Sequence, residues 1–122
     1  MYLNMFEISR TTQGDVVILA VKGQLDALSA GKVKPLLDEL LAEGQNRIVY
    51  DMKDLDLIDS SGIGAVVSTF KRSRADGGDM KLASVRLQPM EVFRVLNLHK
   101  YIETYESAEE AAASFAKNFR KK

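Results

Sequence analysis

Residues 48–64 read Ile-Val-Tyr-Asp-Met-Lys-Asp-Leu-Asp-Leu-Ile-Asp-Ser-Ser-Gly-Ile-Gly. With the preceding arginine, the first part of this stretch (Arg47–Met52) is β-branched and apolar enough to predict a strand. After a polar step, Leu55, Leu57 and Ile58 carry the chain inward to an Asp-Ser-Ser-Gly tetrapeptide at residues 59–62. Aspartate and serine side chains accept hydrogen bonds from the free N–H groups of a first helical turn. The stretch therefore predicts a strand that leads directly into a helix.

Helical and extended patterns continue to alternate downstream. Apolar residues of one helical face recur until an Asp-Gly-Gly turn at 76–78 ends the helix. A final helix is expected from Ser107, because Ser107 and Glu110 have the spacing of a capping box. The predictions between these two helices are a short buried strand over Lys81–Val85, a helix that starts at Pro89 and carries Val92, Phe93, Val95 and Leu96, and a short strand within Ile102–Tyr105.

The N-terminal residues predict a β-hairpin. Met5–Arg10 alternates weakly between polar and apolar residues, and Val16–Val21 is a β-branched apolar run. A Gln-Gly-Asp turn at residues 13–15 lies between them, and Gly23 is expected to close the second strand.

A helix is predicted over Ser29–Glu43, where valine and leucine recur at the spacing of one buried face. Pro35 conflicts with this helix, because proline lacks an N–H group and clashes with the preceding turn. The helix is therefore expected either to kink at Pro35 or to become regular only from about Lys34, with Pro35 at the tolerated first position.

Alternating strands and helices predict an α/β fold with a mostly parallel mixed sheet, to which the hairpin adds an antiparallel element. About four α-helices are expected. No repeat, low-complexity tract or Pro/Gly/Ser-rich linker divides the 122 residues. We therefore expect a single domain over residues 1–122, with its core at about 6–110 and a C-terminal helix at about 107–119.

The composition excludes several classes of function. Seventeen acidic residues balance seventeen basic ones, so no overall charge draws the protein to nucleic acid or to an anionic membrane. The absence of cysteine excludes disulfides, thiolate metal sites and a cysteine nucleophile. No basic leader precedes an apolar run, and no apolar stretch approaches the roughly 20 residues that span a bilayer. We expect a cytoplasmic protein with no cofactor, no metal, and no nucleic-acid or membrane partner.

The Asp-Ser-Ser-Gly segment is the only place where reactive side chains, glycine and a strand-to-helix transition coincide. On its own, such a tetrapeptide is usually a plain helix cap. A serine at a helix N-terminus is also a good phosphate acceptor, because the exposed amides and the helix dipole favour added negative charge. The physics leaves both Ser60 and Ser61 open as the acceptor.

The whole stretch at residues 48–64 resembles the signature of STAS domains in anti-sigma factor antagonists. A second motif, Gly-Gln-Leu-Asp at residues 23–26, is similar to the family's Gly-acid-Leu-Asp turn, at about the family's distance from the first motif. The predicted order of elements also resembles the family from about Phe6 to Glu110. Pro35, Gln24 in place of an acid, and the basic C-terminal end depart from the family pattern.

This resemblance implies a single STAS domain that switches binding partners and is not an enzyme. In the family, the serine after the motif aspartate is phosphorylated by an anti-sigma factor that is a serine kinase of the histidine-kinase-like ATPase fold, and a metal-dependent serine phosphatase removes the phosphate. By position, Ser60 is the acceptor, Asp59 orients it, Ser61 caps the helix or lines the interface, and Gly62 lets the partner approach. Asp26 corresponds to a family position that supports partner binding and phosphorylation.

Three functions compete at this stage: a phosphorylatable antagonist, a stand-alone STAS scaffold or regulatory subunit of another signalling, secretion or transport complex, and a small hydrolase that uses Ser60. The hydrolase is disfavoured, because Ser60 and His99 lack the spacing of a nucleophile elbow and no phosphate-binding Gly-Lys-Ser/Thr loop is present.

His99, the sole histidine, is expected to have a surface or capping role. Near the C-terminus, Phe115 and Phe119 are expected to dock, and the basic residues Lys117, Arg120, Lys121 and Lys122 to complement the helix dipole.

Overall fold

The computed structural model describes residues 6–119, with side chains described as far as Ala116. Five strands form one sheet in the order β1-β2-β3-β4-β5, with β1 antiparallel to β2 and every other pair parallel. The strands are β1 (Phe6–Gln13), β2 (Val16–Leu25), β3 (Arg47–Ile58), β4 (Asp79–Ala83) and β5 (Thr104–Tyr105). The helices are α1 (Ala27–Ala42), α2 (Ser60–Ala75), α3 (Leu87–Val95), the 3₁₀ helix η1 (Leu98–Lys100) and α4 (Ala108–Phe119).

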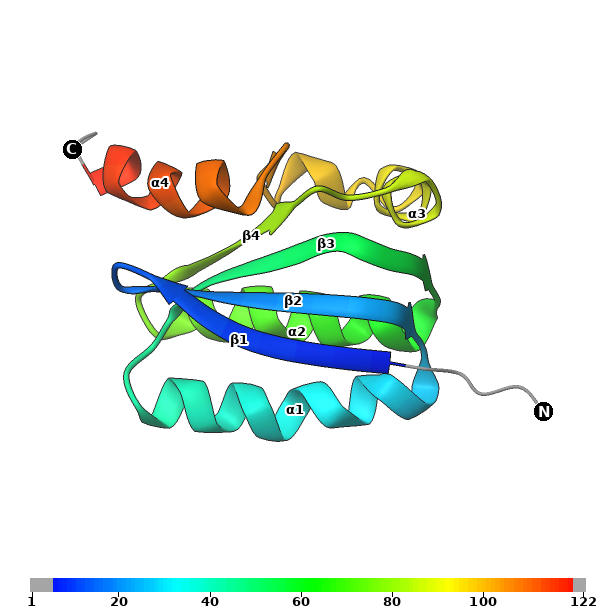
Figure 1. Cartoon of the computed structure of the whole chain (residues 1–122), viewed down its shortest axis with the longest axis horizontal. Coiled ribbons are helices and arrows are strands. Elements are labelled where there is room, and N and C mark those ends of the chain that lie inside the picture. The colour runs from blue at the N-terminus through cyan, green and yellow to red at the C-terminus, as the bar shows by residue number, and fades with distance from the viewer. Residues whose placement is uncertain (1–5, 120–122) are drawn as a thin grey trace.

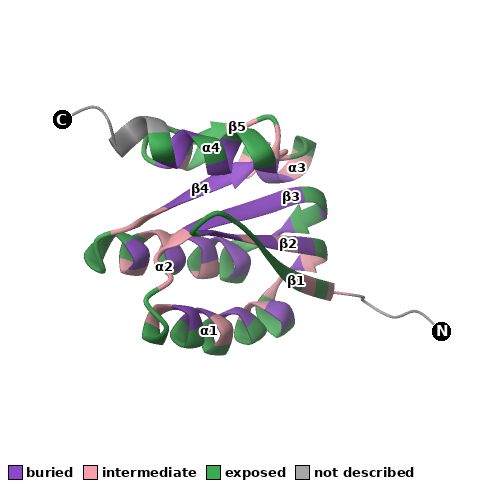
Figure 2. Cartoon of the chain, turned by 60° about the vertical axis from the view of Figure 1, so that its left-hand side comes forward, coloured by how far each residue is buried: buried purple, intermediate pink, exposed green. Residues whose placement is uncertain are grey.

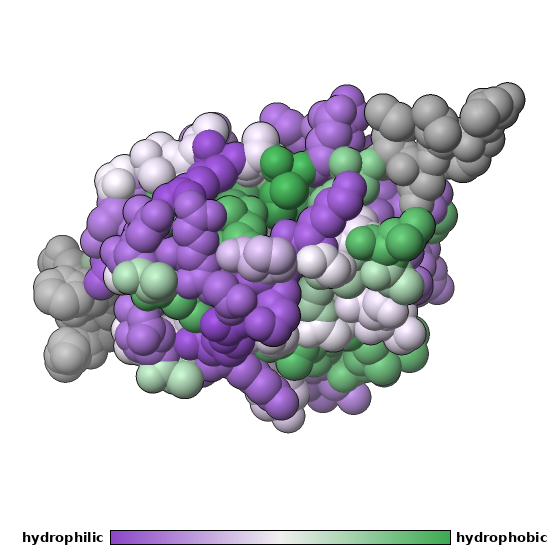
Figure 3. Space-filling model, turned by 90° about the horizontal axis from the view of Figure 1, so that it is seen from below, coloured by the Kyte–Doolittle hydropathy of each residue, from purple (hydrophilic) through white to green (hydrophobic). Residues whose placement is uncertain are grey.

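Helices cover both faces of the sheet. In Figure 1, α1 lies below the sheet, α2 lies behind β1 and β2, and α3 and α4 lie above the sheet. The predicted α/β fold, with a mostly parallel sheet, an N-terminal hairpin and four α-helices, is confirmed. The face seen from below, on the side of α1, carries mostly hydrophilic side chains with smaller apolar areas between them (Figure 3).

Two apolar clusters hold these layers together. The larger cluster joins β2 and β3 to α1 and α2 and extends to Phe93 of α3 and to Ile102. The smaller cluster packs α4 against the opposite sheet face, where Ala108, Ala111, Ala112 and Phe115 contact residues of β2, β3 and β4. The inner strands are accordingly buried, whereas β1 at the edge is largely exposed (Figure 2).

The hairpin has the predicted turn, with Gly14 at φ +64°, a conformation that glycine adopts at little cost. The prediction that Gly23 closes β2 was wrong, because the strand continues to Leu25. Gly23 instead lies inside the strand at φ +99°, next to a shift in the β2–β3 register. The added residues bring the end of β2 to the helix that follows.

The bounds of α1 test one of the two predictions for the helix around Pro35. The late start at Lys34 was wrong, because α1 begins at Ala27 and contains Pro35 in its interior. Proline removes the hydrogen bond to the Gly31 carbonyl, four residues earlier. Gly31 and Pro35 are both exposed, so water can satisfy that carbonyl.

Strand β3 runs six residues beyond the predicted end at Met52. Its pairing with β2 shifts twice, between Ala20 and Lys22 and again between Gly23 and Gln24. At each shift β3 contains one more residue than β2, as in a β-bulge, and a bulge redirects the side chains after it. Leu57, which was predicted to point inward, is consequently 44% exposed.

Smaller differences occur toward the C-terminus. β4 lies two residues before the predicted Lys81–Val85, and α3 begins at Leu87, before Pro89. Val95 and Leu96, which were predicted to belong to this helix, are 75% and 51% exposed. The serine half of the predicted capping box is present at the final helix, because Ser107 Oγ accepts a hydrogen bond from the Glu110 N–H at 3.1 Å. The predictions for the side chains of Lys117 and Phe119 and for Arg120, Lys121 and Lys122 concern positions outside the described part of the chain.

Candidate functional site

The two sequence motifs meet at one edge of the sheet. Asp26 follows β2 and Asp59 follows β3, and the carboxyl ends of neighbouring parallel strands lie side by side. A hydrogen bond of 3.2 Å from the Asp59 N–H to the Leu25 carbonyl joins the two loops. The fold therefore brings Asp26 and residues 59–62 together, although more than thirty residues separate them in the sequence.

Asp59 caps helix α2. Its backbone is extended, and its Oδ1 accepts a hydrogen bond of 3.0 Å from the Gly62 N–H. Ser60 is therefore the first helical residue and does not serve as the cap. Its side chain is exposed and has no hydrogen-bond partner among residues 6–119. The Ser60 hydroxyl is thus accessible at the positive end of the helix dipole.

Asp26 caps helix α1 in the same way. Its carboxylate accepts hydrogen bonds from the Leu28 and Ser29 N–H groups at 3.1 and 3.2 Å, while its own N–H donates to Ser29 Oγ at 2.8 Å. This reciprocal pair is a capping box. Asp26 is half-buried, so its carboxylate helps to hold the loop beside Ser60 in one conformation.

Two adjacent serines line two different grooves. Ser60 lines a groove of about 490 Å³ between α2 and α3, which we call the Ser60 groove. Ser61 lines a groove of about 340 Å³ between α1 and α2, the Ser61 groove. Successive helical residues point about 100° apart, which explains this divergence. The structure thus separates the environments of two residues that the sequence left equivalent.

The Ser60 groove is mainly apolar. Ile58, Ile63, Val92, Val95 and Leu96 contribute its apolar lining. Its polar lining consists of Asp59, Ser60, Gln88 and Glu91. The Gln88 amide is already engaged, because it accepts from the Ile58 N–H at 3.0 Å and donates to the Ile58 carbonyl at 3.2 Å. These two bonds attach α3 to the end of β3, beside Ser60.

The Ser61 groove is more polar and contains small side chains. Lys34 and Arg72 line it, and both form ion pairs with Asp38, at 3.1 and 2.8 Å. The hydrogen bonds from Arg72 and Lys34 lower the pKa of the Asp38 carboxyl below its usual value. The cations of this groove are therefore already paired on the protein.

Gly62 has a packing role inside the protein, and its predicted role in partner approach stays a prediction. It is buried, and a Cβ atom there would overlap the Leu25 carbonyl oxygen and lie 2.7 Å from Ile58 Cγ1. The close approach that requires glycine is therefore between α2 and the end of β2, within the protein. Gly64, by contrast, is exposed, and a Cβ atom there would meet nothing within 4 Å.

His99 is exposed on η1 and does not line the Ser60 groove. Residues 6–119 contain no group of three or more His, Cys, Asp or Glu side chains that could hold a metal ion. Within the same residues, none of the helices has the length and apolar character required to cross a bilayer.

Sequence reasoning missed the exposed apolar side of α3. Leu87, Val95 and Leu96 are 89%, 75% and 51% exposed, whereas Phe93 of the same helix is buried. Apolar residues on more than one side of a short helix were the available signal, because one buried face cannot accommodate all of them. Two of these exposed residues, Val95 and Leu96, line the Ser60 groove.

Comparisons with known proteins agree on one family. A family model described as the STAS domain matches residues 7–111. A Thermotoga maritima protein with the provisional name of anti-sigma factor antagonist is 32% identical over 98 residues, which are 80% of this chain and 87% of that protein. The crystal structure of a protein with that provisional name, also from Thermotoga maritima, has a TM-score of 0.84 and 28% identity, and the match covers 89% of this chain and 94% of that one. A sulfate transporter family protein from Wolinella succinogenes shares the fold at a TM-score of 0.74 and 16% identity, with 92% and 93% of the two chains covered.

Proposed function

The chain belongs to the STAS domain family, and we propose that it is an anti-sigma factor antagonist whose binding to an anti-sigma factor serine kinase is turned off by phosphorylation of Ser60. The kinase would have the histidine-kinase-like ATPase fold, and a metal-dependent serine phosphatase would restore the unmodified protein. The protein itself would act in the cytoplasm as a binding switch and not as an enzyme. The name of the Thermotoga maritima relative and the position of Ser60 after the motif aspartate support this proposal.

The observation that carries the proposal is the state of the Ser60 hydroxyl. It is exposed at the start of α2, and Asp59 performs the capping that would otherwise occupy it. A phosphate at this position would lie close to free backbone N–H groups of the first helical turn. Ser61 points into the other groove, which supports Ser60 as the acceptor.

The added charge should act on binding more than on folding. An exposed phosphate at a helix N-terminus stabilises the fold by about 0.3–1 kcal/mol, and the carboxylates of Asp26, Asp56 and Asp59 would oppose even that. At an interface, the same charge of about −2 must be desolvated beside apolar side chains of the Ser60 groove. Reversal of a 99:1 bound population requires a differential of about 5.5 kcal/mol, which only the interface can supply.

The groove also indicates the direction from which the kinase would approach. Ser60 shares one groove with Val95 and Leu96, so a protein that reaches the Ser60 hydroxyl covers these exposed side chains. Exposed apolar groups near a modification site are suited to act as binding anchors. In this proposal α3 is the apolar half of the interface and the Ser60 loop, residues 59–62, is the half that responds to phosphate.

The central experiment is a titration of four forms of the protein against the kinase: wild type, Ser60→Ala, Ser60→Asp and Ser61→Ala. With nucleotide present, phosphate should appear on wild type and Ser61→Ala but not on Ser60→Ala, as determined by mass spectrometry. Ser60→Ala should bind as tightly as unmodified wild type, and Ser60→Asp at least tenfold more weakly. Phosphate on Ser61, or equal affinity of the phosphorylated and unmodified forms, would refute the proposal.

A scaffold or regulatory subunit of another complex is the second candidate function. The shared fold of the Wolinella succinogenes transporter family protein shows that this architecture is not confined to antagonists. Affinity capture with wild type and Ser60→Asp as matched baits separates the two functions. A switch kinase that is retained by wild type and lost by Ser60→Asp favours the antagonist, whereas a partner retained equally by both favours the scaffold.

A further inference from the structure

A second hollow lies on the sheet, away from the Ser60 loop. It has a volume of about 500 Å³ and is lined entirely by residues of β1, β2 and β3. The pairing register places Ser9, Ala20 and Asp51 in one row across these strands, and Glu7, Lys22 and Asp54 in the next row. Asp51 lies between Tyr50 and Met52, which belong to the core on the side of α1 and α2. Its side chain therefore points to the opposite face of the sheet.

Asp51 is the only buried acidic residue in the described part of the chain, with 9% exposure. Its Oδ1 accepts a hydrogen bond from the Lys53 N–H at 3.2 Å. Lys53 lies at the first register shift of β3, where a bulge interrupts the strand pairing. This structural task requires only one acceptor oxygen, which a neutral asparagine would also provide.

The charge of Asp51 is not explained by that task. Between residues 6 and 119, no cation lies within ion-pair distance of its carboxylate. Its Oδ2 has no hydrogen-bond partner there. In this part of the chain, every side-chain oxygen or nitrogen that is shielded from solvent has a hydrogen-bond partner. Oδ2 is therefore not shielded from solvent and is open to the hollow that Asp51 lines. A carboxylate removed from most of its solvent without a cation is costly.

We propose that this hollow binds the ammonium or guanidinium group of a small organic cation, with Asp51 as its anionic partner. Three carboxylates line the hollow, Glu7, Asp51 and Asp54, against two ammonium groups, Lys22 and Lys53, so one negative charge is in excess. Its volume is within the usual range for small-molecule sites. N–H donors of the cation would pair Oδ2 and neutralise the excess charge.

The test uses ethylammonium and methylguanidinium chloride as probes and the backbone amide NMR signals of Ala20, Asp51 and Lys53 as the readout. In wild type these signals should shift and saturate, whereas sodium chloride and tetramethylammonium chloride, which offer no N–H donor, should leave them unshifted at equal ionic strength. Asp51→Asn should bind the probes at least tenfold more weakly. Glu106→Gln, which removes an exposed charge outside the hollow, should bind like wild type.

Stability in the absence of the probes provides an independent readout. Asp51→Asn keeps an acceptor for the Lys53 N–H and removes an unpaired charge, so it should unfold at the same or a higher denaturant concentration than wild type. Ala20→Val, which keeps the carboxylate but narrows the hollow, should also weaken probe binding. The absence of a saturable shift in wild type, equal affinity in Asp51→Asn, or a clear loss of stability in ligand-free Asp51→Asn would each overturn the proposal.

Discussion

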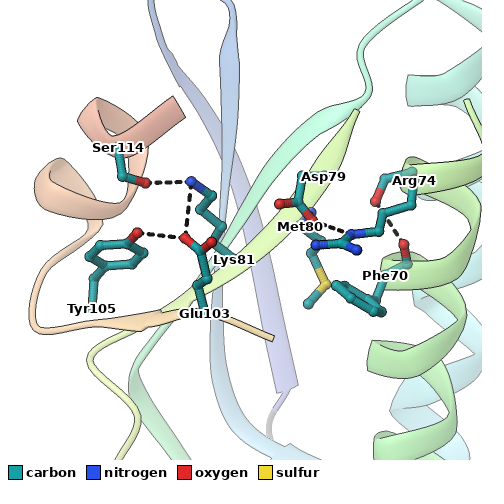
Figure 4. Close-up of polar contacts among 9 residues, drawn as sticks. Phe70, Arg74, Asp79, Met80, Lys81, Glu103, Tyr105 and Ser114 are labelled. Atoms are coloured by element: carbon teal, nitrogen blue, oxygen red, sulfur yellow. Dashed lines mark hydrogen bonds and ion pairs between the residues drawn. The ribbon is translucent and has the colours of Figure 1, made fainter. Parts of the chain in front are cut away.

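The Lys81 cluster, formed by Lys81, Glu103, Tyr105, Ser114 and Phe115, and the Ser60 loop contain similar polar groups. Lys81 is buried, whereas Ser60 is exposed. The Lys81 side chain is fully buried, and its Nζ lies 2.6 Å from Ser114 Oγ and 3.2 Å from Glu103 Oε1 (Figure 4). The same ammonium lies 4.3 Å from the ring centroid of Phe115 and 5.6 Å from that of Tyr105. The Ser60 hydroxyl, by contrast, is exposed and has no partner among residues 6–119.

This difference shows how one fold assigns polar residues to different tasks. In the Lys81 cluster, the charge is compensated inside the protein by a carboxylate, a hydroxyl and two rings, which join β4, β5 and α4. Helix α4 packs largely through alanines, so the cluster supplies much of its specific attachment. At the Ser60 loop the caps are satisfied and the acceptor is left free, which suits a group that is modified and recognised.

The contrast is tested most strongly by Lys81→Ala. Removal of this fully buried side chain leaves a cavity beneath α4, and truncation of a large buried side chain to alanine costs about 2–5 kcal/mol. Glu103 also loses its partner, but it is 45% exposed, so water can replace the ammonium. The free energy of unfolding, measured by chemical denaturation, should fall by about 3 kcal/mol. Lys71→Ala, at an exposed position of α2, is the matched control and should change it by less than about 0.5 kcal/mol. A loss below about 1 kcal/mol in Lys81→Ala would show that the cluster does not hold α4.

Alanine substitutions at Gly62 and Gly64 test how tightly the start of α2 packs against the end of β2. Gly62→Ala should lower the free energy of unfolding by about 2 kcal/mol, because the new methyl group overlaps the Leu25 carbonyl. Gly64→Ala adds the same methyl group in open space and should raise it by about 0.5–1 kcal/mol, because alanine is the better helix former. Thermal unfolding of both variants measures the difference. Equal effects would mean that the packing between α2 and β2 is not tight.

The exposed apolar side chains that line the Ser60 groove should affect kinase binding and not folding. Val95→Asp is expected to weaken kinase binding at least tenfold, about 1.4 kcal/mol, because an exposed anchor in the Ser60 groove becomes charged. Its free energy of unfolding should stay within about 0.5 kcal/mol of wild type. Leu28→Asp is the control, since Leu28 is 81% exposed but lies in the first turn of α1 and does not line the Ser60 groove. A larger loss of affinity in Leu28→Asp than in Val95→Asp would place the kinase on the side of α1.

The smallest effect is the pH dependence of the Lys81 cluster. Burial raises the pKa of Glu103, but the hydrogen bond from Tyr105 and the charge of Lys81 outweigh it and lower this pKa below its usual value of 4.5. A lowered pKa in the folded state contributes stability above pH 4.5 that is lost as the pH falls through the folded-state value. The stability difference between wild type and Glu103→Gln should therefore shrink between neutral pH and pH 3 or so, as measured by denaturation across that range. A constant difference would contradict the pairing of Glu103 with Lys81.

Local patterns in the sequence were sufficient for the order of elements. The β-branched runs, the turn glycines and the capping residues predicted every strand and α-helix, because periodicity and caps depend on residues close together in the chain. Most errors were shifts of element ends, such as the late start predicted for α1. There, the capping box of Asp26 starts the helix and solvent accepts the carbonyl freed by Pro35.

Burial and the choice between neighbouring groups required the tertiary structure. Leu57 turns outward because the register of β3 shifts against β2, a strand more than thirty residues away. The environment of Lys81 is assembled from Glu103, Tyr105 and Ser114, which no local pattern joins to it. The sequence by itself determined the alternation of strands and helices and placed two serines at a helix start. Only the packing of α1, α2 and α3 gave these serines different grooves, because the exposure of a side chain depends on what lies opposite it in space.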